Sequence, residues 1–148
     1  ISEVINSVIK YFEKRLPQTG KDVELIYAHK ESIEINLNES LFEWVLENLI
    51  KNAIDAIGSK KGRIQIALQI NPEAIELRIS DNGKGINPKN KNDIFKPGYS
   101  TKSRGWGLGL SLAKRIVEDY HKGKLILLSS VPNEGTTFLI ILKRDLKN

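Results

Sequence analysis

The stretch ENLIKNAIDAI at residues 47–57 constrains the fold more than any other part of the sequence. Its apolar residues recur with helical spacing, and the polar residues Asn48, Asn52 and Asp55 follow one another at intervals of four and three. That spacing places the three polar side chains along one face of a helix. Because buried amides and carboxylates are costly without partners, the stretch predicts a core helix that presents a polar face to a ligand or a polar segment.

Hydrophobic periodicity divides the chain into helices and strands. The expected helices share apolar residues at helical spacing: 2–15, 38–57 and 108–120. The expected strands share alternating or continuous apolar residues: 23–28, 32–37, 63–70, 74–80, 124–130 and 136–143. The first helix is expected to end before Pro17, and Ser40 with Glu43 matches a capping box at the start of the second. Residues 93–106 are expected to form a long loop of the kind that often binds ligands.

The order of these elements predicts one α/β domain. A two-layer sandwich is expected, in which a mixed, mostly antiparallel sheet carries helices on one face. A chain of 148 residues with 40% hydrophobic content is long enough for such a core. Because the chain begins at Ile1 and contains no methionine, it is also expected to be a piece of a longer protein.

Composition excludes several classes of site. The absence of cysteine rules out disulfides, thiolate metal ligands and cysteine nucleophiles. The formal charge of +5 comes from lysines interspersed with glutamates, which favours a solvated surface over a nucleic-acid patch. No apolar run approaches the ~18 residues that a membrane span needs.

Two segments that contain glycines are further candidates for ligand binding. In DNGKGI, Asp81 follows a strand and precedes Gly83 and Gly85, so that a small ligand can approach the backbone while the carboxylate accepts a hydrogen bond from an amine such as adenine N6. An ordinary turn is the alternative. In GWGLGL, three glycines open a helix, which suits a phosphate, and a flexible hinge is the alternative. Neither segment matches a Walker loop or a dinucleotide-binding fingerprint.

Taken together, the motifs resemble those of bacterial sensor histidine kinases. ENLIKNAIDAI resembles the N box, DNGKGI the first glycine box, IFKPGYSTK the phenylalanine box and GWGLGLSLAKRIVEDYHKGKL the second glycine box, while EGTTF resembles the last short motif. The order and spacing also agree over roughly residues 23–143. The chain is thus similar to the catalytic ATP-binding domain of these kinases, which share a Bergerat-type fold with gyrase, Hsp90 and MutL.

The resemblance implies ATP and Mg²⁺ as ligands. Asp81 would contact adenine, Asn52 assisted by Asn48 would bind Mg²⁺, and Lys102 or Arg104 would reach the phosphates, so that Asn48, Asn52, Lys102 and Arg104 form the implied catalytic set. The implied nucleotide-binding set also contains Asp55, Gly83, Gly85, Ile86, Phe95, Tyr99, Ser100, Thr101, Gly105, Trp106, Gly107, Leu108, Gly109, Leu110 and Thr136. In that set the glycines shape the pocket and the phosphate loop, Phe95 and Tyr99 anchor a lid, and Thr136 lies near the base edge.

Two of these residues have open roles. Asp55 would pair with a cation of the lid or face water. Trp106 stands where family members usually carry a small or polar residue, and it would shield the nucleotide, pack the lid or contact a partner.

Within this resemblance, the amide of Asn48 favours a kinase over an ATPase. ATP-hydrolysing relatives carry a glutamate base four residues before the metal-binding Asn52, and an amide cannot take a proton from water. The phosphoacceptor histidine would belong to a dimerisation domain of the same parent protein, because His29 and His121 lack the expected context and are interpreted as surface or packing residues. Residues 1–16 would then be the end of a connector and residues 17–148 the catalytic domain.

The resemblance further implies a response regulator receiver domain as a partner, a monomeric isolated domain and a cytoplasmic location, including the cytosolic part of a membrane-bound sensor. The nearest alternative function is a Ser/Thr protein kinase of the anti-sigma type. A nucleotide-gated interaction module without catalysis is the alternative from another class, and a nucleic-acid-binding protein is the weakest interpretation.

Overall fold

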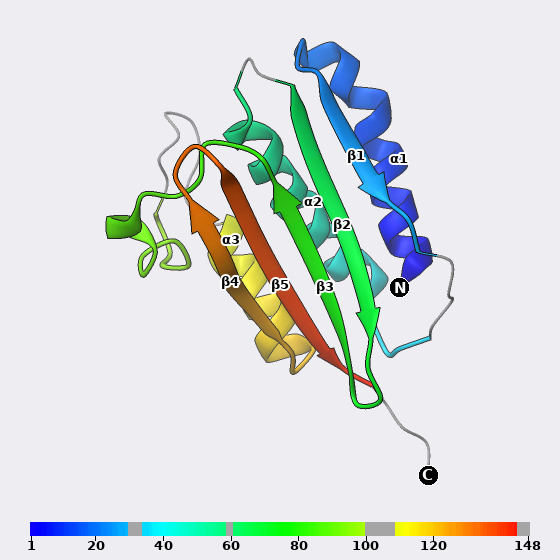
Figure 1. Cartoon of the computed structure of the whole chain (residues 1–148). Coiled ribbons are helices and arrows are strands. Elements are labelled where there is room, and N and C mark those ends of the chain that lie inside the picture. Colours follow the sequence, from blue (N-terminus) through cyan, green and yellow to red (C-terminus); the bar gives the residue numbers. More distant parts are fainter. Residues whose placement is uncertain (30–33, 59–60, 100–108, 145–148) are drawn as a thin grey trace.

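A computed structural model describes residues 1–29, 34–58, 61–99 and 109–144. The elements are α1 (Ser2–Thr19), β1 (Val23–Tyr27), α2 (Glu39–Ala56), β2 (Gly62–Ile70), β3 (Ala74–Asp81), the 3₁₀ turn η1 (Pro88–Asn90), α3 (Gly109–Arg115), the π turn η2 (Ile116–Tyr120), β4 (Lys124–Val131) and β5 (Gly135–Lys143). The described strands form one sheet in the order β1-β2-β3-β5-β4. Only β1–β2 is a parallel pair within it. The helices all cover one face (Figure 1), which confirms the predicted sandwich.

Strand alternation determines which side chains meet the helices. Along β2, Ile64 and Ile66 are buried whereas Arg63 and Gln65 are exposed, as expected for a strand with one covered face. Leu77 of β3 lies opposite Ile140 of β5, and neither residue has any exposed surface. The core therefore lies between this inner face of the sheet and the helices.

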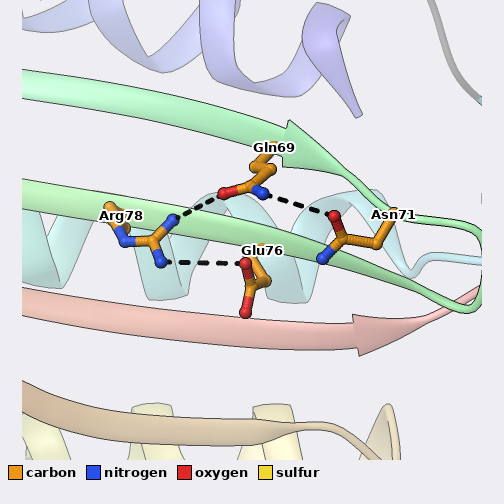
Figure 2. A network of polar contacts seen from close by, with 4 residues as sticks. All are labelled: Gln69, Asn71, Glu76 and Arg78. Carbon is orange, nitrogen blue, oxygen red and sulfur yellow. Dashed lines mark hydrogen bonds and ion pairs between the residues drawn. The ribbon is translucent and has the colours of Figure 1, made fainter.

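The outer face of the sheet is polar along β2 and β3. Arg78 donates from Nη1 to Gln69 Oε1 at 3.2 Å and lies 3.7 Å from Glu76 Oε2, while Gln69 Nε2 donates to Asn71 Oδ1 at 3.3 Å. Figure 2 shows these side chains on the side of the sheet opposite the helices. Exposed contacts of this kind contribute little stability, so their main effect is to keep this face solvated.

The helix α2 begins differently from the prediction. Asn38 is its N-cap, with Oδ1 accepting a hydrogen bond from Leu41 N at 3.0 Å, whereas Ser40 already lies inside the first turn. The predicted capping box at Ser40 and Glu43 was therefore wrong, because the N-cap is Asn38, two residues before Ser40. An extended backbone at Asn38 leaves its side chain free to fold back over the first turn, which is what an N-cap requires.

The helix α1 continues through Pro17, so the predicted end before this residue was wrong. A proline in the last turn removes only one backbone donor, and Gly20 ends the helix in the left-handed conformation at φ 73°. The inner side of α1 joins the hydrophobic core through buried residues: Val4, Ile5, Val8, Ile9, Phe12 and Leu16.

The strand predicted at residues 32–37 is also wrong for the part that is described. Residues 34–37 have no strand conformation, although Ile35 and Leu37 pack against the core. Their alternation reflects two side chains turned toward the core from an irregular segment. Residues 32 and 33 lie outside the described residues.

The helix predicted at 108–120 is a short α-helix followed by a π turn. Its side chains bind the backbone of the edge strand β4: Lys114 Nζ donates to Leu125 O at 3.1 Å, and Leu125 N donates to Glu118 Oε2 at 3.2 Å. Lys114 and Glu118 also form an ion pair at 3.1 Å. This clamp, made of Lys114, Glu118 and Leu125, fixes α3 against the sheet. Across all four described ranges, every helix is too short or too polar to cross a membrane.

Candidate functional site

The first part of the site lies where α2 meets the start of α3. Asn48 Nδ2 donates to Trp44 O at 2.9 Å, one turn earlier in its own helix. This bond turns Oδ1 toward Gly109, where a Cβ atom would lie only 2.7 Å from that oxygen. The polar face predicted from ENLIKNAIDAI therefore presents an amide oxygen to the first residue of α3, and glycine is what permits the close approach.

The other two polar residues of α2 differ in exposure. Asn52 is half-buried one turn beyond Asn48, whereas Asp55 is exposed. Asn48 and Asp55 both line a groove of about 480 Å³ between α1 and α2, together with Arg15 and Lys51. Asp55 thus belongs to a charged groove on the outside of the helical layer, and its role at a nucleotide stays a prediction.

The second part of the site is the glycine-box turn after β3. Gly83 N donates to Asp81 Oδ1 at 2.8 Å, which holds the carboxylate over the turn. Gly83 is buried against α2, since a Cβ there would lie 2.7 Å from Ala56 O, and Lys84 N donates to the same carbonyl at 2.9 Å. The turn is therefore docked on the last turn of the helix that carries Asn48 and Asn52.

The turn is also attached to the β4–β5 hairpin. Gly85 adopts φ 74° with its Cα facing Val131 O, so a side chain would meet that carbonyl. Asn133 N donates to Lys84 O at 2.7 Å, and Ile86 N donates to Ser130 Oγ at 2.8 Å. These contacts bring the predicted residues Gly85 and Ile86 together with the end of β4.

Thr136 lies directly opposite Asp81 across the β3–β5 ladder and is almost fully buried. Its Oγ1 is 2.8 Å from Ser130 Oγ, and Lys91 Nζ donates to Ser130 O at 2.8 Å. Sequence reasoning missed Ser130 and Lys91. The signal for Ser130 was present, because a serine on the inward-facing side of an apolar strand needs a hydrogen-bond partner.

Phe95 and Leu110 lie beside this region. The ring of Phe95 packs edge-on against Phe138 with centroids 6.1 Å apart, and Lys114 Nζ lies 4.6 Å from its centroid. Leu110 and Tyr99 are half-buried and pack against the core. The predicted residues Ser100, Thr101, Lys102, Arg104, Gly105, Trp106, Gly107 and Leu108 lie outside the described residues.

The family model described as "Histidine kinase-, DNA gyrase B-, and HSP90-like ATPase" matches residues 37–146, which contain every part of this site. The chain belongs to this family. Its family is one of ATPases, so ATP is the ligand that membership implies for this domain.

Individual relatives are sensor histidine kinases. The sensor histidine kinase YvrG of Bacillus subtilis is 36% identical over 144 residues, covering 94% of this chain and 24% of that protein. The nucleotide-free catalytic domain of histidine kinase ThkA has a TM-score of 0.82 at 29% identity, covering 97% of this chain and 93% of that structure. ThkA in complex with the response regulator TrrA gives 0.79 at 26% identity, with coverages of 98% and 40%. The fold is that of a histidine kinase catalytic domain, and the chain spans about a quarter of the length of YvrG.

Proposed function

We propose that this chain is the catalytic domain of a two-component sensor histidine kinase. It binds Mg²⁺–ATP and donates the γ-phosphate to a histidine on a dimerisation domain of the parent protein. The observation that carries the proposal is Asn48, whose amide oxygen faces the start of α3 at the position where ATP-hydrolysing relatives have a glutamate base. An amide there cannot activate water, and this favours transfer to a nucleophile that another domain supplies.

The residues present fit the two ligands. Asn48 directs an oxygen rather than its NH₂ group toward α3, because Nδ2 is held by Trp44 O. Oxygen atoms are the ligands that Mg²⁺ prefers, and it keeps several waters when few protein oxygens are available. Asn52 is the second proposed ligand from the same helix face. At the other end of the site, the Asp81 carboxylate is proposed to accept a hydrogen bond from the adenine amino group, with Gly83 and Gly85 allowing close contact.

Catalysis would then depend on position and charge. Bound Mg²⁺ supplies neutralisation of the phosphate oxygens. The chain itself holds the base at Asp81 and Thr136 and the metal at Asn48 and Asn52, while Lys102 or Arg104 is proposed to contact the phosphates. Phe95, Tyr99 and Gly109 are proposed to position that phosphate-binding segment at its two ends.

The two histidines of the chain support an acceptor elsewhere. His121 Nε2 accepts a hydrogen bond from Asn38 N at 3.1 Å, and Nδ1 lies 2.9 Å from Ile116 O. Since a carbonyl can only accept, Nδ1 carries the proton, and both ring nitrogens are engaged in holding α2 to the π turn. His29 has its Nε2 atom buried from solvent. Both nitrogens of His121 and Nε2 of His29 are thus withdrawn from an incoming phosphoryl group.

The remaining proposals concern the parent protein and its partners. Residues 1–16 would lead from its dimerisation domain, and a response regulator would receive the phosphoryl group, a role in keeping with the complex that the relative ThkA forms with the response regulator TrrA. We also propose that the isolated domain is monomeric and that it works in the cytoplasm.

The test is calorimetry of ATP, ADP and GTP with and without Mg²⁺, followed by incubation of the Mg²⁺–ATP complex with a supplied histidine-bearing dimerisation domain. We expect adenine-selective binding, an effect of Mg²⁺ on ATP affinity, and an acid-labile phosphohistidine on the supplied domain. Replacement of Asn52 by alanine should reduce the Mg²⁺ effect. Absence of nucleotide binding would reject the proposal, and phosphorylation of a serine instead would favour an anti-sigma type kinase.

A further inference from the structure

Ser130 and Thr136 form a pair of hydroxyl groups that is nearly sealed from water. The two side chains are 5% and 6% exposed, and their oxygens are 2.8 Å apart. Each hydroxyl has one proton to donate, and buried donors almost always find an acceptor. The hydrogen bond between the two oxygens contains only one of their two protons. Which hydroxyl donates in this bond therefore decides which of the two keeps a proton that it can donate to a ligand.

The backbone of the glycine-box turn favours one of the two directions. Ile86 N–H can only donate, and it donates to Ser130 Oγ at 2.8 Å. Among the described residues, the hydrogen-bond partners of Ser130 Oγ are this N–H group and Thr136 Oγ1. Either oxygen of the pair can be the donor, and with Ile86 N–H donating to Ser130 Oγ, the Ser130 proton can go to Thr136 Oγ1. In that arrangement the Thr136 hydroxyl accepts from Ser130 and has its own proton available for another partner.

Thr136 is the cross-strand partner of Asp81, so the two side chains project from the same face of the sheet. The site thus offers an acceptor and a donor next to each other. Adenine presents the complementary pair on one edge, an amino donor beside a ring-nitrogen acceptor. Guanine has an oxygen acceptor where adenine has its amino group, next to an N–H donor, and so meets both groups with the wrong polarity.

We propose that Ser130 is a positioning residue for base recognition, which directs the Thr136 hydroxyl to act as a donor toward the bound base. The inference rests on the proposed function, since it assumes that the base lies at Asp81. Lys91 contributes by holding the backbone of Ser130 through the hydrogen bond to its carbonyl. Through these contacts Ser130, itself in β4, is joined to β5 at Thr136 and to the segment between the glycine-box turn and Lys91.

The experiment measures the ratio of ATP to GTP affinity by calorimetry in single and double variants. Ser130→Ala should lower this ratio by about tenfold, the value of one good hydrogen bond. Thr136→Val should lower it by a similar factor. Because Ser130 acts through Thr136, adding Ser130→Ala to Thr136→Val should produce no further change in the ratio. Ser130→Thr, which retains the hydroxyl, should return the ratio toward that of the parent.

The chain offers a matched control on the other face of the same sheet. Ser80 and Thr137 form a second hydroxyl pair at 2.9 Å, one position away along β3 and β5. Ser80→Ala removes the same kind of bond without touching the site, and the exposed Ser129→Ala changes the neighbour of Ser130 in β4. Both variants should keep the parent ratio.

Three results would overturn the inference: an unchanged ratio in Ser130→Ala, an equal loss in Ser80→Ala, or additive losses in the double variant. In each of these the parent still binds ATP, so the proposed function survives. If the parent binds neither nucleotide, the proposed function fails and the inference fails with it. Should the alanine variant not fold, Ser130→Cys keeps the size of the side chain and replaces the hydroxyl with a weak donor, and the same ratio decides.

Discussion

Thr136 and Thr137 are neighbours in β5 but face opposite sides of the sheet. Thr136 is buried on the inner face with Ser130, whereas Thr137 is half-buried on the outer face with Ser80. The same contrast holds for the larger polar groups. Asp81 sits at the helix-covered end of β3, while the network of Gln69, Asn71, Glu76 and Arg78 lies on the open face (Figure 2).

The difference between the faces is one of solvent rather than of residue type. Water can replace the partners in the exposed network of Gln69, Asn71, Glu76 and Arg78, so those hydrogen bonds are interchangeable and weak. On the inner face each donor and acceptor must be matched within the protein or by a ligand. Polar residues there carry specificity, and their loss should be measurable.

The largest expected effect concerns packing on the inner face. Ile140→Ala removes a side chain without exposed surface and should lower the free energy of unfolding by about 2–5 kcal/mol. Ile126→Ala, on the outer face of the adjacent strand and 37% exposed, should cost less than about 1 kcal/mol. Urea denaturation measures both values. Equal losses would mean that the outer face of β4 is also covered.

Asp81→Asn should have the next largest effect, on binding rather than folding. Replacing the carboxylate removes a charged acceptor for the adenine amino group, whose bond is worth about 1.5–3 kcal/mol. We expect the ATP affinity to fall by about ten- to a hundredfold, with a smaller change for GTP. Calorimetry with both nucleotides measures this, and parent-like binding of the two would remove Asp81 from the base site.

Gly109→Ala should weaken the effect of Mg²⁺ on ATP binding while leaving the stability of the fold nearly unchanged. The added Cβ meets the end of the Asn48 side chain, which can rotate away at little cost to stability. The displaced amide oxygen would no longer face α3, so we expect the Mg²⁺-dependent part of ATP affinity to fall by about tenfold. Gly58→Ala is the control, because a Cβ added there would meet nothing within 4 Å. A full Mg²⁺ effect in Gly109→Ala would place the cation elsewhere.

Arg78→Ala should have the smallest effect. It removes the centre of the outer network, whose contacts are partly exposed, and should change the free energy of unfolding by less than about 1 kcal/mol. Nucleotide affinity should not change at all. A clear loss of binding would show that the two faces of the sheet are coupled, contrary to the comparison.

Most of the fold could be predicted from local sequence patterns. Alternation along β2 and β3 predicted both strands within one residue. Asn48 was identified because polar groups on an apolar helix are conspicuous. The closeness of Asn48 to Gly109 follows from the packing of α2 on α3, but the spacing of the two motifs gave no distance.

The errors arose where a remote contact decides the outcome. Asn38 rather than Ser40 caps α2 at a position where His121, 83 residues away, also accepts from its backbone. Pro17 is tolerated because it lies in the last turn of α1, just before Gly20 ends the helix. The inward position of Ser130 on an apolar strand could be read from the sequence, but its partner Ile86, 44 residues earlier in the chain, could not. Sequence patterns report periodicity well, whereas single hydrogen bonds between distant segments leave no local trace.

The clamp of Lys114 and Glu118 on Leu125 affects whether copies of this domain aggregate at high concentration. β4 is an outer strand of the sheet, and the segment Leu125–Leu128 is rich in leucine and isoleucine, a composition that invites another strand to add alongside. The two side chains of the clamp occupy the N–H and C=O groups of Leu125 that such an intruding strand would need. Removal of the clamp would therefore leave a template for intermolecular β-pairing, and aggregation would be its first symptom.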